Sequence, residues 1–588
     1  MSKVTNNGPI SFSSIFDMEA MKERRTKLYQ DALKQIDDKI EFSNTEIEAV
    51  YKLQQSISAL QIASSKFKAG ILNSRSQAFS QKTTDAITND VGNAGDYVTA
   101  TIDSKNAAKG DIDVTVTALA TTASVRTGLF VAGYNAMTAN RAIQVDITNN
   151  GVGVAPITVN VLQNDTLQVV CNKLNAQLNA QNVEAILVKQ ASTNQQALVL
   201  RSTVTGLRTI TVSNTADFGA EFGNGGAAGA GIAVVEAPGA NASAVVDGVV
   251  ITSSSNKLTG VLPGVDLNLR KINTLGQKQT ISVIDDVKQA AEQIGDLLKA
   301  YNDYIKFSAI QQNWTGEDYA KDAVLGKANN RAIQTADNII KNMVSIVPGL
   351  QGDITGLGSI GIGSQMIPAD GNNTPAIPQL TVVDQERFTN AITNNLDGVD
   401  KLFRNNTVIT PTANAGSTLI YLDSSRVLPA NIMGEDIQIR VDVDGGGAVT
   451  AVRFSLDNGV NFVAAAYNNG FITFENTALA GMRLFFQNPA NIAVNGTEEY
   501  TVNVVQGVCD KLSIGLNGLV NTTATGVVDR ALQKANEDLK RYNVEKDKAQ
   551  TALDDQQKKI AAEVFQLRML EIEAEFFNDF LEGLLDNR

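Results

Sequence analysis

The chain has 588 residues, and its 49 Lys and Arg against 62 Asp and Glu give a formal net charge of −13 at pH 7. This acidic balance argues against a nucleic-acid binder, because phosphate contacts need an excess of basic side chains. The sequence contains no histidine, which excludes Ser-His-Asp and Cys-His triads and imidazole metal sites built from this chain alone. The length suggests roughly three to five domains.

The first 30 residues are predicted to form a flexible segment. Residues 1–10 show neither an apolar stretch nor a small-residue cleavage site, so a cleaved signal peptide is not indicated. We therefore expect either a cytoplasmic protein or one that is exported without a cleaved signal. The two cysteines, Cys171 and Cys509, form no CxxC pattern, and we expect them to be small buried hydrophobic side chains.

Apolar residues recur at steps of three and four at both ends of the sequence. Near the N-terminus the pattern starts at Leu33 and continues, after a phase slip, to Ile71, which predicts a coiled-coil-like amphipathic helix. At the other end the steps run from Val528 to Leu584, a helix roughly 85 Å long that needs a partner helix. The candidate partner-binding residues of these helices are Leu33, Ile36, Ile40, Leu567, Leu570, Phe577, Leu581 and Leu584.

Two arrangements of these terminal helices fit the periodicity equally well. In one, both chain ends form a single rod that carries everything between them. In the other, the helices form an ordinary antiparallel coiled coil that serves only as a dimer seam. A cluster of phenylalanines near the C-terminus lies among glutamates, which favours a protein partner over membrane insertion.

The middle of the sequence alternates apolar and polar residues, which predicts antiparallel strands over 96–280 with one helix from Leu167 to Leu178. Helical spacing returns in three stretches, and a second β-rich region over 405–505 interrupts them as an insertion. The predicted fold is therefore a multidomain α+β protein, in which a helical rod carries antiparallel β-rich head domains. The rod segments are 31–95, 281–404 and 506–588, and the three helical stretches are Ile284–Phe307, Arg331–Val347 and Gln385–Phe403.

Motifs for chemistry are weak throughout the sequence. Residues 356–361 match GxGxxG, but no strand leads into them and no helix pattern follows. Residues 442–446 begin like a calcium loop, yet the twelfth position is Arg453 instead of glutamate, so a hairpin turn is expected. The Gly/Ala tract 223–231 is expected to be a surface loop. We expect no enzyme activity, cofactor or metal, although inspection does not exclude a glycosidase that uses only carboxylates.

Several stretches taken together resemble the bacterial flagellar cap family, also called hook-associated protein 2. They follow the family order over about residues 97 to 404. The family's N-terminal GSGLD sequence is missing, and residues 10–17 stand in its place. The matching stretches are Ile112-x-Val114-x-Val116-x-x-Leu119-Ala120, Leu262-Pro263-Gly264-Val265-Asp266-Leu267-Asn268-Leu269, Ala300-Tyr301-Asn302 and Leu357-Gly358-Ser359-Ile360-Gly361-Ile362.

The resemblance implies a secreted structural protein at the tip of the flagellar filament. Several copies would form a cap ring, with the terminal helices as legs, and flagellin would fold and insert beneath it. The implied partners are other copies of the chain, flagellin, the hook–filament junction protein and a type III export chaperone, with no nucleic acid and no membrane insertion. Two alternatives stay open: another axial protein, such as flagellin or the junction protein, and a secreted adhesin whose helices form only a stalk.

Overall fold

The protein is described by a computed structural model, which divides into two compact units. We call Met1–Phe79 with Val287–Arg588 the leg unit, and Ser80–Asp286 the head. The residues that the structure describes are 18–69, 75–85, 88–89, 95–130, 134, 136–193, 195–212, 235–274, 276–313, 323–328, 330–345, 350, 352–369, 375–405, 408–411, 418–424, 436–457, 459–487 and 496–585.

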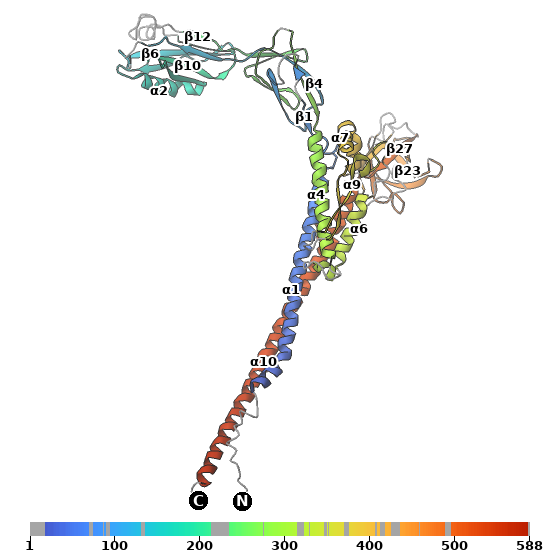
Figure 1. Cartoon of the computed structure of the whole chain (residues 1–588). Helices are drawn as coiled ribbons and strands as arrows, with labels where there is room; N and C mark the ends of the chain where they lie inside the picture. Colours follow the sequence, from blue (N-terminus) through green and yellow to red (C-terminus); the bar gives the residue numbers. More distant parts are fainter. Residues whose placement is uncertain are drawn as a thin grey trace. The chain divides into compact units, whose positions relative to one another are not determined.

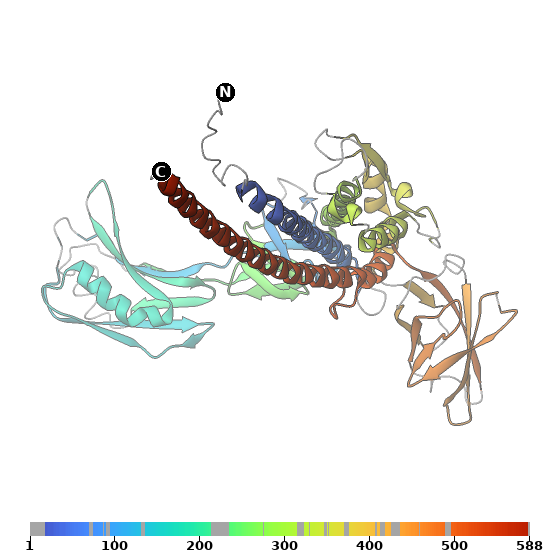
Figure 2. The same cartoon turned by 90° about the horizontal axis from the view of Figure 1, so that it is seen from below.

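Two long helices from opposite ends of the chain pack side by side in the leg unit (Figures 1 and 2). They are α1, Met18–Ser65, and α10, Val527–Leu585. The two helices are antiparallel, because Gln54 near the end of α1 donates to Asp529 near the start of α10 at 3.1 Å. Within the described residues, no helix is long and apolar enough to cross a membrane.

The start of α10 depends on a glycine and an aspartate. A Cβ at Gly526 would lie 2.1 Å from the carbonyl oxygen of Leu519, so a larger residue does not fit there. The Asp529 carboxylate accepts the Gly526 amide at 3.1 Å, which satisfies a backbone donor at the helix start. The same carboxylate accepts from Gln54, so one side chain both caps α10 and joins it to α1.

Shorter helices pack on the upper part of α1 and enclose the core of the leg unit. Fully buried Leu53, Ile57 and Leu60 of α1 belong to this core, together with Tyr304. The apolar stripe of α1 is therefore covered on more than one side, which explains why its pattern slips in phase. The surrounding elements are α4 (Val287–Gln312), α5 (Val324–Lys327), α6 (Arg331–Ser345), η3 (Leu357–Ile360), the hairpin β18 (Ile362–Ile367) and β19 (Ile377–Val382), α7 (Gln385–Asn394), α8 (Leu396–Phe403) and α9 (Val508–Leu519).

Two buried carboxylates tie segments of the leg unit together. Asp337 of α6 accepts from Tyr304 of α4 at 2.8 Å and from Gln312 at 2.6 Å. Asp400 of α8 has no exposed surface, and it accepts from the amide and the hydroxyl of Ser76 while pairing with Arg404. Because buried charges are costly without partners, these contacts fix which segments meet.

The head contains two separate cores, each with its own sheets. All strand pairs among the described residues of the head are antiparallel, as predicted. One core lies between the sheet β1-β17-β4-β13-β14 and the sheet β15-β16-β3, and the other surrounds α2 (Leu167–Leu178). The strands are β1 (Lys82–Thr84), β2 (Thr88–Asn89), β3 (Val98–Ile102), β4 (Gly110–Ala118), β5 (Thr122–Arg126), β6 (Arg141–Asn149), β7 (Val152–Gly153), β8 (Ile157–Val161), β9 (Val183–Lys189), β10 (Gln196–Thr205), β11 (Arg208–Val212), β12 (Val235–Ala237), β13 (Ala242–Val246), β14 (Val249–Ser253), β15 (Lys257–Leu262), β16 (Val265–Leu269) and β17 (Gln279–Asp285).

Side-chain amides in the head supply backbone hydrogen bonds to the edge strands β3 and β9 of two sheets. Gln279 accepts the amide of Val98 at 2.9 Å and donates to its carbonyl at 3.1 Å. Asn175 of α2 does the same for Ala185. Each amide thus satisfies a buried donor and acceptor that would otherwise lose their partners.

The inserted β region forms one sheet with its own core. Its eight strands follow the order β20-β27-β22-β23-β24-β25-β26-β21, and the first and last of these contact each other, so the sheet curls into a barrel. Buried Ile439, Phe454 and Tyr500 are part of its core. The strands are β20 (Val408–Pro411), β21 (Thr418–Ser424), β22 (Asp436–Val443), β23 (Val449–Ser455), β24 (Val463–Asn468), β25 (Phe471–Thr473), β26 (Met482–Gln487) and β27 (Thr497–Val505).

The α+β multidomain class is confirmed, but several predicted boundaries differ from the structure. Helix α1 begins at Met18, so part of the segment predicted to be flexible is helical, and it ends at Ser65 instead of continuing to Ile71. Strands β1 and β2 pair with β17, which places residues 80–95 and 281–286 in the head instead of the rod. These short strands lack the clear alternation that marks the longer ones.

Three local motifs have separate outcomes. The predicted helix over Gln385–Phe403 is two helices, because Asn395 leaves the helical conformation and its side chain caps α8 by accepting the Gly398 amide. The turn over 442–446 joins β22 to β23, which confirms the predicted hairpin. Residues 356–361 contain the short turn η3, and the Gly/Ala tract 223–231 lies outside the described residues.

Candidate functional site

Three contacts define the antiparallel register of α1 and α10 along the leg, and the first is the Gln54–Asp529 hydrogen bond described above. Lys546 pairs with Asp37 at 2.7 Å, and further along, Arg25 pairs with Glu563. Only about seven residues of described α1 precede Arg25, whereas α10 continues from Glu563 to Leu585 for about 22 more. At 1.5 Å per residue, the last part of α10 therefore extends roughly 20 Å beyond the described part of α1.

The structure separates the candidate partner-binding residues into two groups. Leu33 is buried, and Ile36 and Ile40 are half-buried, in the part of α1 that packs on α10. The α10 residues lie beyond the Arg25–Glu563 pair and are exposed, with fractional exposures of 36% for Leu567, 60% for Leu570, 62% for Phe577, 41% for Leu581 and 54% for Leu584. The two groups do not meet in the described chain, so the α10 group forms a surface of its own.

A second apolar stripe runs along the same end of α10, and it contains Phe565, Phe576 and Phe580 of the phenylalanine cluster for which a protein partner is predicted. Its members follow steps of four, three, four and four, which place Phe576 about half a turn around the helix from Leu567. The predicted cluster also contains Phe577, which the helix places on the first stripe, so the sequence reasoning did not separate the two faces. The second stripe consists of Phe565, Met569, Ile572, Phe576 and Phe580, all exposed.

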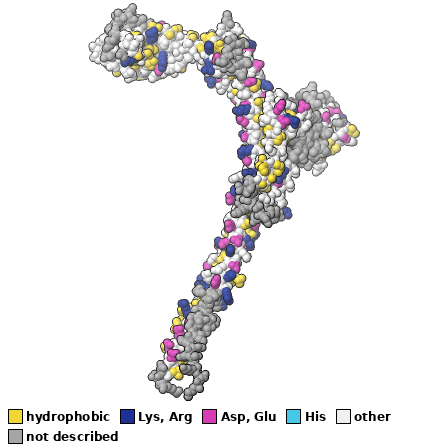
Figure 3. All heavy atoms as spheres, in the orientation of Figure 1, with side chains coloured by type: hydrophobic (Ala, Val, Ile, Leu, Met, Phe, Trp, Pro, Cys, Tyr) yellow, Lys and Arg dark blue, Asp and Glu magenta, His cyan; other side chains and the backbone are white. Residues whose placement is uncertain are grey.

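Acidic side chains separate the two stripes. From Phe565 to Leu585 the helix carries five carboxylates and one basic residue, Arg568. Figure 3 shows hydrophobic and acidic side chains next to each other near the free end of the leg unit. An apolar helix face with this exposure and flanking charge is suited to a helical partner that carries basic side chains. The carboxylates at issue are Glu571, Glu573, Glu575, Asp579 and Glu582.

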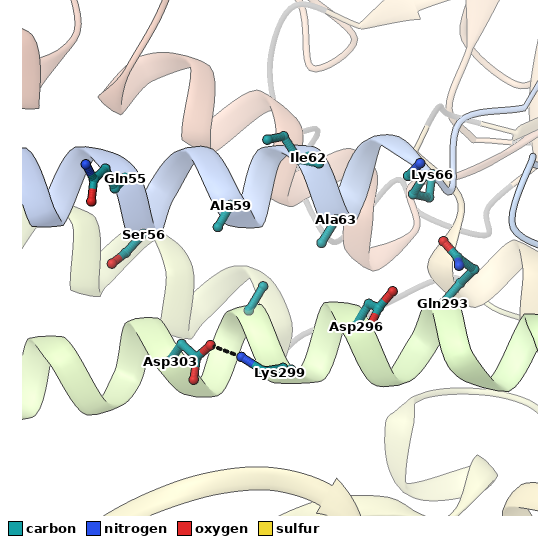
Figure 4. A pocket seen from close by; sticks show the side chains of 11 residues that line it. Gln55, Ser56, Ala59, Ile62, Ala63, Lys66, Gln293, Asp296, Lys299 and Asp303 are labelled. Atoms are coloured by element: carbon teal, nitrogen blue, oxygen red, sulfur yellow. Dashed lines mark hydrogen bonds and ion pairs between the residues drawn. The ribbon is translucent and has the colours of Figure 1, made fainter.

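A groove of about 530 Å³ lies between α1 and α4, nearer the middle of the leg unit (Figure 4). Ala59 and Ala63 of α1 line it together with the Lys299–Asp303 ion pair of α4, whose atoms lie 2.6 Å apart. The Ser56 hydroxyl in its wall donates to the carbonyl of Lys52. The groove offers small apolar and polar contacts, and its lining shows no nucleophile beside a general base.

The described residues contain no arrangement for metal or thiol chemistry. No group of three or more His, Cys, Asp or Glu side chains in this part of the chain is placed to hold a metal ion. Cys171 and Cys509 are both buried, as predicted. Burial raises the pKa of the Cys171 thiol to about 11 and raises the pKa of Cys509 well above its usual range, so neither thiol is activated.

The chain joins a two-helix leg to β modules, each of which has its own hydrophobic core. The leg ends in an exposed apolar surface. This architecture is that of a structural protein that assembles with other subunits. Residues 239–572 match the family model for the flagellar hook-associated protein 2 C-terminus, and residues 14–123 match the model for its N-terminus. The chain belongs to the flagellar hook-associated protein 2 family. The resemblance identified from the sequence motifs is thus confirmed.

Two curated relatives come from other bacteria. The A-type flagellar hook-associated protein 2 of Pseudomonas aeruginosa is 25% identical over 332 residues, which are 53% of this chain and 64% of the relative. The lateral flagellar hook-associated protein 2 of Vibrio parahaemolyticus is 27% identical over 321 residues, 52% of this chain and 66% of the relative. The chain thus spans slightly less than two thirds of the length of each.

Solved structures of flagellar cap proteins are also similar. The D1-D2-D3 domains of the Escherichia coli cap protein FliD align with 60% of this chain and 89% of their own, at 22% identity and a TM-score of 0.40. FliD (HAP2) from Pseudomonas aeruginosa PAO1 aligns with 36% of this chain and 95% of its own, at 23% identity and a TM-score of 0.28.

Proposed function

We propose that this protein caps the tip of the bacterial flagellar filament, where it promotes the folding and insertion of exported flagellin and prevents its loss to the medium. In this role it is required for filament elongation and motility. Family membership supports this function, and the observation that carries it is the exposed, two-sided apolar end of α10. No covalent chemistry is needed, in keeping with a chain that has no histidine.

The end of α10 is the part of the leg that engages other axial subunits. Each stripe buries several large side chains when a partner helix packs on it, and burying one Phe or Leu contributes about 1.5–3 kcal/mol. Two faces on one helix allow contact with two neighbours at once, as in a lattice of helices. The partners proposed for the protein are further copies of the chain in a cap ring, flagellin, the hook–filament junction protein and a type III export chaperone, and export proceeds without a cleaved signal peptide.

The decisive experiment replaces exposed residues of the first stripe. In a strain that lacks the gene, the double variant Phe577→Asp/Leu581→Asp should fail to restore filaments, and unassembled flagellin should accumulate in the medium. Both side chains are already exposed, so the free energy of unfolding of the isolated chain should change by only about 0.5 kcal/mol. Electron microscopy of cells, immunoblots of the supernatant and circular dichroism of the purified variant give the three readouts.

A matched control lies on the same helix. Val544 is 47% exposed and lies on the paired part of α10, outside the apolar stripes, so Val544→Asp should restore normal filaments. Normal filaments in the double variant would refute the role of the leg end. Normal filaments in cells without the gene, combined with a loss of surface attachment, would instead identify an adhesin whose helices form a stalk.

The second stripe is tested separately with Phe576→Asp/Phe580→Asp. If α10 contacts neighbours on both faces, this variant should also release flagellin while its fold stays intact. Full activity of this variant beside an inactive first-stripe variant would restrict the interface to one face.

A further inference from the structure

The head contains a joint where its two cores meet. We call residues 95–120 with 240–285 the first lobe, and residues 121–239 the second lobe. The chain crosses between them at Ala120–Thr121 and again at Gly239–Ala240. The two crossings are hydrogen-bonded to each other, because the amide of Thr121 donates to the carbonyl of Ala240 at 3.0 Å and the Thr121 hydroxyl accepts the Ala240 amide at 3.0 Å.

A turn of the second lobe adds a third contact outside these crossings. This turn, residues 205–208, connects β10 to β11 and reaches the first lobe, where the Thr205 hydroxyl donates to the carbonyl of Ser254 at 2.6 Å. The amide of Leu207 donates to the side chain of Asn241 at 2.6 Å. Two adjacent crossings alone form an axis about which the lobes could bend, and a third hydrogen-bonded segment packed against both crossings opposes that bending.

Two glycines allow the three backbones to approach this closely. A Cβ at Gly239 would lie 2.4 Å from the carbonyl oxygen of Gly206 and 2.9 Å from that of Thr121. Gly206 has a φ of +116°, and a Cβ there would lie 2.7 Å from the Cβ of Ser254. Because the close atoms at Gly239 are backbone atoms, a methyl group forces the segments apart instead of displacing a flexible side chain.

A side chain of the first lobe also binds the backbone at the first crossing, Ala120–Thr121. The Asn256 side chain accepts the amide of Ala120 at 2.7 Å and donates to the carbonyl of Ala120 at 2.9 Å. The residue directly before the crossing is therefore fixed to the first lobe, while Thr121 directly after it also accepts the Gly206 amide of the second lobe at 3.1 Å. The chain thus passes from one lobe to the other within a single peptide unit, so no flexible linker separates the lobes at this crossing.

We propose that this three-segment joint locks the two lobes of the head into one rigid body, with Gly206 and Gly239 as its positioning residues. The head then presents both lobes in a fixed mutual orientation to whatever it contacts. This inference concerns the head alone and does not depend on the proposed capping function.

The test measures the distance between the lobes in the full-length chain. Spin labels are placed at Val250→Cys in the first lobe and Val188→Cys in the second, both exposed, while the natural cysteines are buried. Pulsed electron paramagnetic resonance should give one narrow distance distribution. Gly239→Ala should shift or broaden it, because the added methyl separates the crossings.

A matched control carries the same substitution where there is room. Gly153 lies in the second lobe with no atom within 4 Å of an added Cβ, so Gly153→Ala should leave the distribution unchanged. Thr205→Val is a milder probe that removes only the hydrogen bond to Ser254, and it should broaden the distribution without unfolding either lobe. A broad distribution in the unmodified head, or an unchanged one in both Thr205→Val and a folded Gly239→Ala, would overturn the proposal.

Discussion

Replacing Asp400 with alanine should open the junction between α8 and the segment that follows α1. In the structure the Asp400 carboxylate accepts the Ser76 hydroxyl at 2.6 Å and the Ser76 amide at 3.1 Å, and it pairs with Arg404. The side chain of Asp400 is completely buried and that of Arg404 is 5% exposed. The substitution therefore leaves a buried guanidinium without its carboxylate.

The cost follows from this burial. Breaking a buried ion pair by removing one partner destabilises a protein by about 3–5 kcal/mol. Native-state hydrogen exchange on peptides covering 75–79 and 396–405 is the suitable assay, because a chain with several cores does not unfold in one step. Since about 1.4 kcal/mol corresponds to a tenfold change in an equilibrium, exchange there should accelerate by about two to three and a half orders of magnitude.

Another pair with the same spacing provides the control. Glu48 and Lys52 also stand four residues apart on a helix, at 2.9 Å, but both are largely exposed. Glu48→Ala should therefore change local stability by only about 0.3–0.5 kcal/mol. The apolar double variant Asp400→Leu/Arg404→Met should recover part of the lost protection, because it removes both buried charges but still leaves the Ser76 amide and hydroxyl without their acceptor. If Asp400→Ala changed exchange no more than Glu48→Ala does, the buried pair would not hold this junction.

Three further predictions concern the leg unit. Burial lowers the pKa of Lys511 from 10.5 to about 8, so between about pH 8 and 10 the unfolded leg unit binds more protons than the folded one, and the free energy of unfolding of the leg unit should rise with pH. Lys511→Met should remove this rise in denaturant titrations at several pH values, followed by the α-helical circular dichroism signal, which comes mainly from the leg unit. Leu53→Ala should destabilise the leg unit by about 2–5 kcal/mol because Leu53 is completely buried, whereas Leu570→Ala should cost the isolated chain about 0.5 kcal/mol or less, as thermal unfolding followed by the α-helical circular dichroism signal would show. Replacing residues 406–505 with a short Gly-Ser linker should leave the leg unit folded, because the backbone amide of Asp510 donates to the carbonyl of Arg404 at 3.1 Å where the insert begins and ends. Loss of the α-helical circular dichroism signal would contradict this.

The sequence predicted the elements whose periodicity is long and regular. The 4-3 steps located α10 to within one residue at each end, and the helix Leu167–Leu178 and the strands Ile157–Val161 and Val265–Leu269 have the predicted bounds. The helix Leu167–Leu178 and the two strands each bury one continuous face, and α10 buries its face only in the part that packs on α1, so local pattern and tertiary environment agree over these parts. Their accuracy reflects this agreement and not helix or strand propensity alone.

The sequence predicted the bounds of α1 less well, because contacts with other elements determine where this helix begins and ends. The first turns of α1, from Met18, are rich in charged residues and show little apolar periodicity. The end of the predicted pattern fails for another reason: Phe67 is buried, but in a turn where it contacts Phe79 and Phe403, so its burial comes from distant segments. For the candidate site, the apolar spacing of the first stripe of α10 is visible in the sequence, but its exposure beyond the Arg25–Glu563 pair is not.

The antiparallel packing of α1 on α10 also constrains the order in which the protein can fold. The Arg25–Glu563 pair joins residues 538 positions apart in the chain. Contacts at such separation form late, because closing so long a loop costs entropy before it brings any stabilisation. The two head cores and the inserted barrel consist of contacts made within their own segments, and they shorten this loop as they form. A chain that emerges progressively from its N-terminus therefore completes its β modules first, and the leg assembles only when the last residues have appeared.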